Sequence, residues 1–184
     1  MTDSEAPAPA ASRVPATLDD LAAVAHGTFF APHSVLGGHV DPASGAVTVR
    51  VVRPLADEVE ILTEHGSTPA EHEHEGVWAA VLPDADGHVP DYRVRARYGD
   101  EVTVADDPYR FLPTVGELDQ HLVREGRHEE LWTVLGANTK TFPGTLGDVH
   151  GTAFAVWAPN ARAVRVIGDF NTWSGSSHPM RSLG

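Results

Sequence analysis

The sequence predicts a mainly β protein with two tandem antiparallel immunoglobulin-like β-sandwiches, joined by a short helical connector, the second of them truncated. Three observations lead to this fold class. Apolar and polar residues alternate in short runs, with the period of two that half-buried strands have. The 17 glycines and 14 prolines separate these runs often enough to supply many turns. Near the middle of the chain the alternation gives way to a helical pattern, and afterwards it returns and repeats.

Composition excludes several classes of protein. With 184 residues, 41% hydrophobic and 21% charged, the chain can form a packed core. Its formal net charge of -13 argues against nucleic acid or an anionic membrane surface as a partner, whereas neutral glycans are compatible with it. No apolar run approaches the roughly 18 residues of a membrane span, and the N-terminus lacks the features of a secretory signal. The chain has no cysteine, which is usual in a reducing compartment, so we expect a cytoplasmic protein.

The first 17 residues are expected to form a disordered tail. They are rich in Ala, Pro and Ser and cannot bury enough apolar surface to offset the entropy of ordering. A short helix should follow, with Thr17 as its N-terminal cap, Asp20 in its first turn and Gly27 after its last turn.

The first sandwich domain is expected over residues 18–112. Its clearest strands are 47–52, where valines alternate with Thr48 and Arg50, and 92–98, where three arginines alternate with apolar residues. Gly99 and Asp100 should turn the chain into a further strand at 102–104. The other strand candidates are 59–62 and 78–82.

Residues 113–138 are expected to form the helical connector. Two groups of apolar residues recur there at helical spacing: Leu118, Leu122 and Val123, and then Leu131, Val134 and Leu135. Gly126 separates the two groups, and Gly136 ends the second.

Residues 139–184 are expected to form the truncated second sandwich, because they repeat the first. A shift of 105 residues lays 48–54 over 153–159 without a gap, and the strand-ending prolines Pro54 and Pro159 coincide. The same shift carries 76–78 to 181–183, where the sequence stops. The second copy should therefore lack the rear strands of the first.

Several motifs together resemble one enzyme family. They are PHSVLGGH (32–39), DPYRFLPTVGEL (107–118), GRH (126–128), LGA (135–137), FAVWAPNARAVRVIGDFNTW (154–173) and HPMR (178–181). In this order they are similar to the N-terminal region of bacterial 1,4-alpha-glucan (glycogen) branching enzymes. The resemblance covers about residues 20–184.

The resemblance implies a first sandwich, a second of the isoamylase N-terminal type (carbohydrate-binding module family 48), then a catalytic (β/α)8 barrel and a C-terminal β domain. The family cleaves an α-1,4-glucan and transfers the cut segment to a 6-hydroxyl, using carboxylates of the barrel in a retaining double displacement. None of that barrel is in this sequence, so we expect no catalytic residue, no metal and no cofactor here. The chain should be inactive alone.

The resemblance implies α-glucan (glycogen or maltooligosaccharide) as the ligand of this region, and an intramolecular contact with the absent barrel. The candidate carbohydrate-binding residues are Trp173, Asn171 and Trp157. An indole can stack on the C–H face of a glucose ring, and an amide can bind a hydroxyl. Two alternatives stay open: a stand-alone α-glucan-binding protein and a purely structural docking module. For Trp173 the competing interpretation is packing at the sandwich edge or at the interface with the missing barrel, and for Trp157 packing against the connector helices is favoured.

Other polar clusters are interpreted structurally. His65 and the alternating run at 71–75 suggest metal ligands but more simply form a solvated turn. His33 and His39 should bind loop backbone. The pairs Asp19–Asp20 and Asp106–Asp107 should serve as caps and turn residues.

Overall fold

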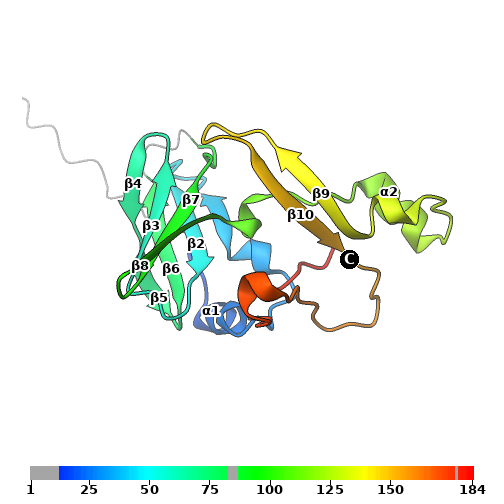
Figure 1. Ribbon diagram of the computed structural model, residues 1–184, viewed down its shortest axis with the longest axis horizontal. Coiled ribbons are helices and arrows are strands. Elements are labelled where there is room, and N and C mark those ends of the chain that lie inside the picture. Colours follow the sequence, from blue (N-terminus) through cyan, green and yellow to red (C-terminus); the bar gives the residue numbers. More distant parts are fainter. Residues whose placement is uncertain (1–12, 83–86, 177) are drawn as a thin grey trace, which may run out of the picture.

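The structure, a computed structural model, describes residues 13–82, 87–176 and 178–184. A β-sandwich occupies one end of the molecule, and a long hairpin with a short helix lies at the other (Figure 1). Most of the expected N-terminal tail lies outside the described residues. Its last part, 13–17, contacts the sandwich, as described below.

The sandwich consists of two four-stranded antiparallel sheets, as expected for the fold class. One has the order β1-β2-β6-β5 and the other the order β4-β3-β7-β8. The strands of the first are β1 (Gly37–Val40), β2 (Val47–Val52), β5 (Glu71–His74) and β6 (Val77–Leu82). Those of the second are β3 (Glu58–Thr63), β4 (Gly66–Pro69), β7 (Arg93–Tyr98) and β8 (Glu101–Asp106).

The main core lies between these two sheets. Alternate residues of β2, including Val49 and Val51, are fully buried and pack with Ile61 of β3 and Val94 of β7. β-Branched side chains at every second position fill this space well, which is why the alternating runs fold as strands. On the outer face of β7, arginines pair with acidic residues of β3, as between Arg95 and Glu60 at 2.5 Å.

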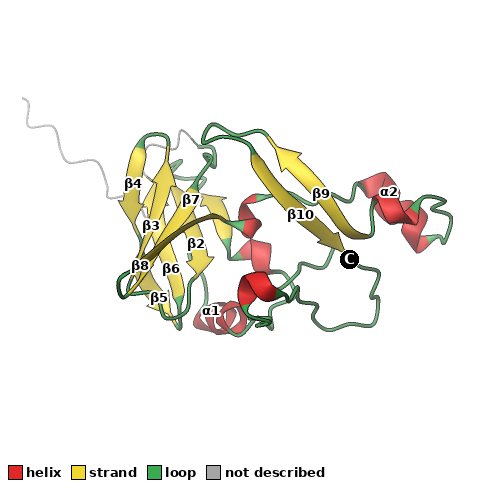
Figure 2. Cartoon of the chain, viewed as in Figure 1, coloured by secondary structure: helices red, strands yellow, loops and turns green. Residues whose placement is uncertain are grey.

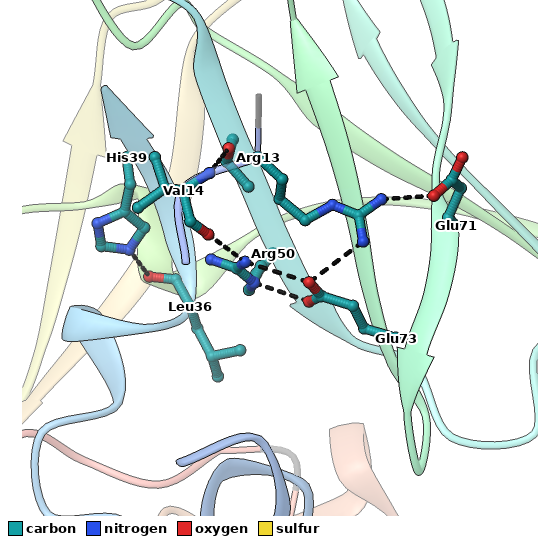
Figure 3. Close-up of polar contacts among 8 residues, drawn as sticks. Arg13, Val14, Leu36, His39, Arg50, Glu71 and Glu73 are labelled. Atoms are coloured by element: carbon teal, nitrogen blue, oxygen red, sulfur yellow. Dashed lines mark hydrogen bonds and ion pairs between the residues drawn. The ribbon is translucent and has the colours of Figure 1, made fainter. Parts of the chain in front are cut away.

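The opposite face of β2 is also buried, which the alternating pattern does not predict. Thr48 is 0% exposed and Arg50 2%. Arg50 donates from Nε to Oε2 of Glu73 at 2.7 Å and from Nη2 to Oε1 at 3.1 Å, and it also donates to the carbonyl of Val14 (Figure 3). The run 71–75 is therefore not a solvated turn: Glu71–His74 is strand β5, and Glu73 is the partner that a buried arginine requires.

Helix α1 (Leu18–Ala25) covers this second face and forms a smaller core. Leu21 and Val24 are buried against Val52, Val77 and Tyr109. Thr17 caps the helix as expected, accepting the N–H of Asp20 at 3.1 Å. Gly27 ends it with φ +63.

The middle segment contains helical turns, as expected, but less helix than its pattern indicates. Residues 113–138 contain α2 (Glu117–Arg124) and η3 (Leu131–Thr133), a further turn, η2 (Pro108–Arg110), lies before them, and β9 already begins at Gly136. No residue of α2 is buried, and Leu118 is 69% exposed. The apolar periodicity of this segment therefore corresponds to partial packing: Leu118 and Leu131 are exposed, whereas Leu122, Val123, Val134 and Leu135 are half-buried.

After this segment, β9 (Gly136–Phe142) pairs with β10 (Val149–Ala155) in an antiparallel hairpin. Beyond β10 the chain runs mainly as loop with one helical turn (Figure 2), which is η4 (Asp169–Asn171). Among the described residues there, Arg165 and Pro179 also form an isolated antiparallel bridge. Much less of a sandwich is present here than in the first half.

The two halves repeat the same local structure from the first helix onward. α1, η1 (Pro32–Ser34) and β1 recur 99 residues later as α2, η3 and β9. Helix exits match in detail: the N–H of Thr28 donates to Ala23, and that of Arg127 to Leu122, both at 2.9 Å. We call residues 17–82 the first unit and 116–184 the second. The predicted connector thus contains the start of the second unit.

The repeat continues after the hairpin with the shift of 105 that the sequence gives. Gly37 pairs with Arg50 in the first unit, and Gly136 pairs with Ala155 in the second, so the second hairpin is six residues longer. The next pair of segments also matches, because Glu60 lies opposite Pro69 and Arg165 lies opposite Pro179.

Candidate functional site

The second unit differs from the first most clearly in the loop at 168–176, which we call the presentation loop. In the first unit Ile61 pairs with Thr68, leaving residues 62–67 between them. In the second unit the N–H of Val166 donates to the carbonyl of His178 at 3.0 Å, leaving residues 167–177 between them. The connection is therefore five residues longer than its counterpart in the first unit.

The presentation loop holds two aromatic side chains in solvent. Trp173 is 65% exposed and Phe170 is 62% exposed. Thr172 and Trp173 both adopt left-handed backbone conformations, with φ +50 and +58, which is uncommon for residues other than glycine. Such conformations persist where surrounding contacts hold them, and they cluster at functional sites.

Trp173 is fixed at two points. Its backbone N–H donates to the carbonyl of Gly168 at 2.9 Å, and its indole Nε1 donates to Oδ1 of Asp169 at 2.9 Å. The indole has no other hydrogen-bonding group. Its polar edge is thus satisfied within the loop, while the residue as a whole stays 65% exposed.

Asn171 lies inside the loop and is only 9% exposed. Its Oδ1 accepts the N–H of Gly168 at 2.9 Å, and its Nδ2 donates to the carbonyl of Val166 at 2.9 Å and lies 3.1 Å from Nδ1 of His178. Both amide hydrogens therefore have partners within the protein. The sequence predicts Asn171 as a group that binds a ligand. In the structure its amide instead holds the loop through contacts within the protein.

His178 completes this framework. Burial, followed by the charge of Arg53, lowers the pKa of its imidazole. A neutral ring can accept the amide hydrogen of Asn171 through Nδ1. The ring also packs edge-on against Phe170, with centroids 5.3 Å apart.

Trp157 lies just beyond β10 and is 50% exposed. It lines a groove of about 880 Å³ that also includes Phe111, Phe142, Phe154 and Phe170, whereas Trp173 does not line it. The counterpart of Trp157 in the first unit is Val52, which is 3% exposed and packs beneath α1. Trp157 and Trp173 therefore do not line the same groove, and Trp157 stays half exposed where its counterpart is buried.

One exposed tryptophan was not singled out from the sequence. Trp132, on η3, is 69% exposed. Its counterpart 99 residues earlier is His33, which packs edge-on against Tyr109 with ring centroids 5.0 Å apart. A shift of 99 residues aligns Trp132 with His33, whose ring packs in the first unit, and could have singled out Trp132. The shift of 105 found in the sequence does not align Trp132 with His33.

The DPYRF motif joins the two units. Asp107 is 1% exposed, accepts the hydroxyl of Tyr92 at 2.6 Å and caps η2 through the N–H of Tyr109, as expected for this carboxylate. Burial raises the pKa of Asp107. The hydroxyl of Tyr109 in turn donates to the carbonyl of Pro179 at 3.2 Å, next to the presentation loop. The motif thus anchors the base of the loop to the first sandwich.

Two of the remaining histidines, His72 and His39, bind backbone groups of the fold, whereas within the described residues Nδ1 of His33 is buried without a hydrogen-bond partner. Nε2 of His72 accepts the N–H of Gly76 at 3.0 Å, and Nε2 of His39 lies 3.2 Å from the carbonyl of Leu36. Within residues 13–82, 87–176 and 178–184, no group of three or more His, Cys, Asp or Glu side chains could hold a metal ion. In the same ranges, no helix is both long and apolar enough to cross a bilayer.

Comparison with known proteins places these features in a family. Residues 17–109 match the family model of the alpha-1,4-glucan branching enzyme GlgB N-terminal domain. Residues 134–184, which contain the presentation loop, match that of carbohydrate-binding module 48, the isoamylase N-terminal domain.

Curated relatives agree with this assignment. The chain is 59% identical over 172 residues to the 1,4-alpha-glucan branching enzyme GlgB of Thermobifida fusca, and 51% identical over 166 residues to that of Nocardia farcinica. These alignments cover 92% and 90% of this chain and 22% of each relative. The chain spans about a fifth of the length of the curated relatives that it matches.

Among solved structures, a pullulanase from Paenibacillus barengoltzii, in complex with maltohexaose and alpha-cyclodextrin, aligns with a TM-score of 0.31 and 22% identity. That alignment covers 38% of this chain and 12% of the pullulanase, too little to bear on function. The assignment comes from the sequence comparisons, in which the first match alone spans about half of the chain. The chain belongs to the family of alpha-1,4-glucan branching enzyme GlgB N-terminal domains.

Proposed function

We propose that this chain is the non-catalytic N-terminal portion of a glycogen branching enzyme and that its second unit holds an α-glucan chain through Trp173. The observation that carries the proposal is the match of residues 134–184 to a carbohydrate-binding module. The presentation loop lies within that match, and its exposed indole is the group that suits a sugar ring.

The ligand follows from the family and from the chemistry of the loop. The relatives are named for branching of 1,4-alpha-glucan, so glycogen and maltooligosaccharides are the proposed ligands. A flat apolar face with its N–H already occupied favours stacking on the C–H face of a pyranose over recognition of an anion. In this role the chain supplies position and binding, and the branching chemistry belongs to the remainder of the longer enzyme.

The groove is proposed as the surface that contacts that remainder. Val156 is 55% exposed, Trp157 50% and Phe154 43%, although each occupies a position whose counterpart in the first unit is buried. Exposed apolar groups gathered in one groove are typical of an interface. We therefore infer an intramolecular contact between this groove and the catalytic part of the enzyme, in the cytoplasm.

Affinity electrophoresis through a glycogen-containing gel tests the binding proposal. We expect retardation of the unmodified chain, loss of retardation in Trp173→Ala, and normal retardation in Trp132→Ala. The Trp132→Ala variant is a matched control because its indole is 69% exposed, against 65% for Trp173. If the unmodified chain is not retarded, the alternative of a structural docking module is favoured.

A further inference from the structure

We propose that Asp169 is a positioning residue that fixes the indole plane of Trp173 for stacking against a sugar ring. The purpose assigned to this contact rests on the proposed function. The contact itself, between indole Nε1 and Oδ1 of Asp169 at 2.9 Å, is a property of the loop alone. The two claims can therefore be tested separately.

The design of the loop points to presentation. Its counterpart in the first unit reverses the chain with five fewer residues, so connection alone does not explain its length. The longer loop carries both exposed aromatics, Phe170 and Trp173, and two consecutive left-handed residues, Thr172 and Trp173. A strained backbone that displays an apolar ring costs free energy, which the contacts that hold the loop must offset.

Three of those contacts form the backbone framework. Asn171 binds Gly168 and Val166 through its side chain, and the N–H of Trp173 donates to the carbonyl of Gly168. These contacts fix the Cα position of Trp173 but leave its side-chain torsions free. An exposed indole without a further contact would sample several rotamers.

Asp169 supplies that further contact. A hydrogen bond to a carboxylate is stronger than one between neutral groups, and the indole N–H is the only polar atom that can be held. Restricting the ring before binding removes part of the entropy that a ligand would otherwise lose by ordering it. Asn171 therefore holds the backbone of the loop, and Asp169 holds the ring.

The substitutions Asp169→Ala and Asp169→Asn separate a hydrogen bond from a structural effect. Alanine removes the acceptor, whereas asparagine retains an oxygen at the same position. Asp148→Ala is the control for loss of charge, because Asp148 is exposed in the β9–β10 hairpin connection. The indole N–H resonances are recorded in ¹⁵N-labelled protein, and that of Trp173 is assigned from Trp173→Phe.

We expect Asp169→Ala to speed solvent exchange of the Trp173 indole N–H at least about tenfold, and to weaken binding of maltoheptaose about three- to tenfold, the range for one hydrogen bond. In Asp169→Asn, the indole exchange rate and the affinity for maltoheptaose should both return most of the way to the values of the unmodified chain. Asp148→Ala should change neither the exchange rate nor the affinity. Exchange that is unaltered in Asp169→Ala overturns the positioning role. Altered exchange with unaltered affinity overturns the claim that positioning serves binding.

Failure of the proposed function gives a different result. If the unmodified chain does not bind maltoheptaose or glycogen, the binding proposal fails. The indole exchange still decides whether Asp169 holds the ring: acceleration in Asp169→Ala supports that contact, and no acceleration overturns it.

Discussion

Removing the partner of the buried arginine should destabilise the first sandwich far more than removing an equivalent surface partner. The perturbation is Glu73→Gln. The side chain of Arg50 is 2% exposed and that of Glu73 14%, and two hydrogen bonds of 2.7 and 3.1 Å join them. After the substitution, Arg50 remains charged and buried with a neutral amide as its neighbour. Breaking a buried pair in this way costs about 3–5 kcal/mol.

The expected loss is at the lower end of that range, about 3 kcal/mol, because Glu73 keeps some exposure and Arg50 retains the carbonyl of Val14. Glu60→Gln is the matched control, since Glu60 and Arg95 form another Arg–Glu pair between strands, at 2.5 Å. Their side chains are 33% and 38% exposed, so the control should cost less than about 1 kcal/mol.

Urea denaturation followed by far-ultraviolet circular dichroism measures both variants. The double variant Arg50→Met with Glu73→Met should recover part of the loss, because no unpaired charge is left in the interior. Equal free energies of unfolding for Glu73→Gln and Glu60→Gln would refute the reasoning. The reasoning would also be refuted if the double variant were less stable than Glu73→Gln by about another 3 kcal/mol, the cost of breaking a second buried pair.

Two further predictions concern a histidine of the first unit and the glycines that begin β1 and β9. Burial, followed by the charges of Arg181 and His39, lowers the pKa of His33 to about 4. In the unfolded chain this imidazole has a pKa near 6.5 and binds a proton more readily than in the folded protein. The free energy of unfolding therefore falls as the pH decreases from 6.5 towards 4. The loss of unfolding free energy between pH 7 and pH 5 should be about 1 kcal/mol smaller in His33→Gln, a figure already reduced for the partial exposure of the ring. Denaturation at the two pH values measures it, and an unchanged pH dependence in His33→Gln would contradict this prediction. Gly37→Ala should be much more destabilising than Gly136→Ala, which should cost about 1–2 kcal/mol. Both glycines have φ near +90, but only at Gly37 would an added Cβ lie 2.5 Å from the carbonyl oxygen of Tyr109. Equal melting temperatures for the two alanine variants would disprove the difference.

The sandwich could be predicted because its information is local. Valines at every second position of β2 and arginines at every second position of β7 identify half-buried strands directly. The fate of the second face of β2 was not predictable in this way. Thr48 and Arg50 have the polarity of a solvated face, and their burial depends on α1, on residues 13–16 and on Glu73. The sequence does not predict β5 for the same reason: its partly buried residue is Glu73, a charged side chain whose burial depends on the ion pair with Arg50.

The repeat was only partly visible in the sequence. Insertions of six residues in the β9–β10 hairpin and of five in the presentation loop break a gapless alignment. A single shift of 105 therefore finds the strands but not α2 or η3, which follow a shift of 99. These segments then read as a connector.

The loop itself shows what residue types can and cannot predict. Exposure of Trp173 agrees with its selection as a candidate contact, because an indole next to Gly, Asp and Asn is typical of a loop. The inward position of Asn171 depends on three backbone and side-chain partners that no spacing encodes. A side-chain amide can form hydrogen bonds with a sugar hydroxyl or with the backbone, and in the structure that of Asn171 binds the backbone of Gly168 and Val166.

The most direct test of the central claim is a titration of the chain with maltoheptaose, observed through its tryptophan indole N–H resonances. Glucan binding through the presentation loop predicts a saturating shift of the Trp173 resonance, small changes at Trp132, and no saturating shift of any indole in Trp173→Ala. Saturation with undiminished affinity in Trp173→Ala, or shifts confined to the other indoles, would contradict the assignment of this loop as the glucan-binding site.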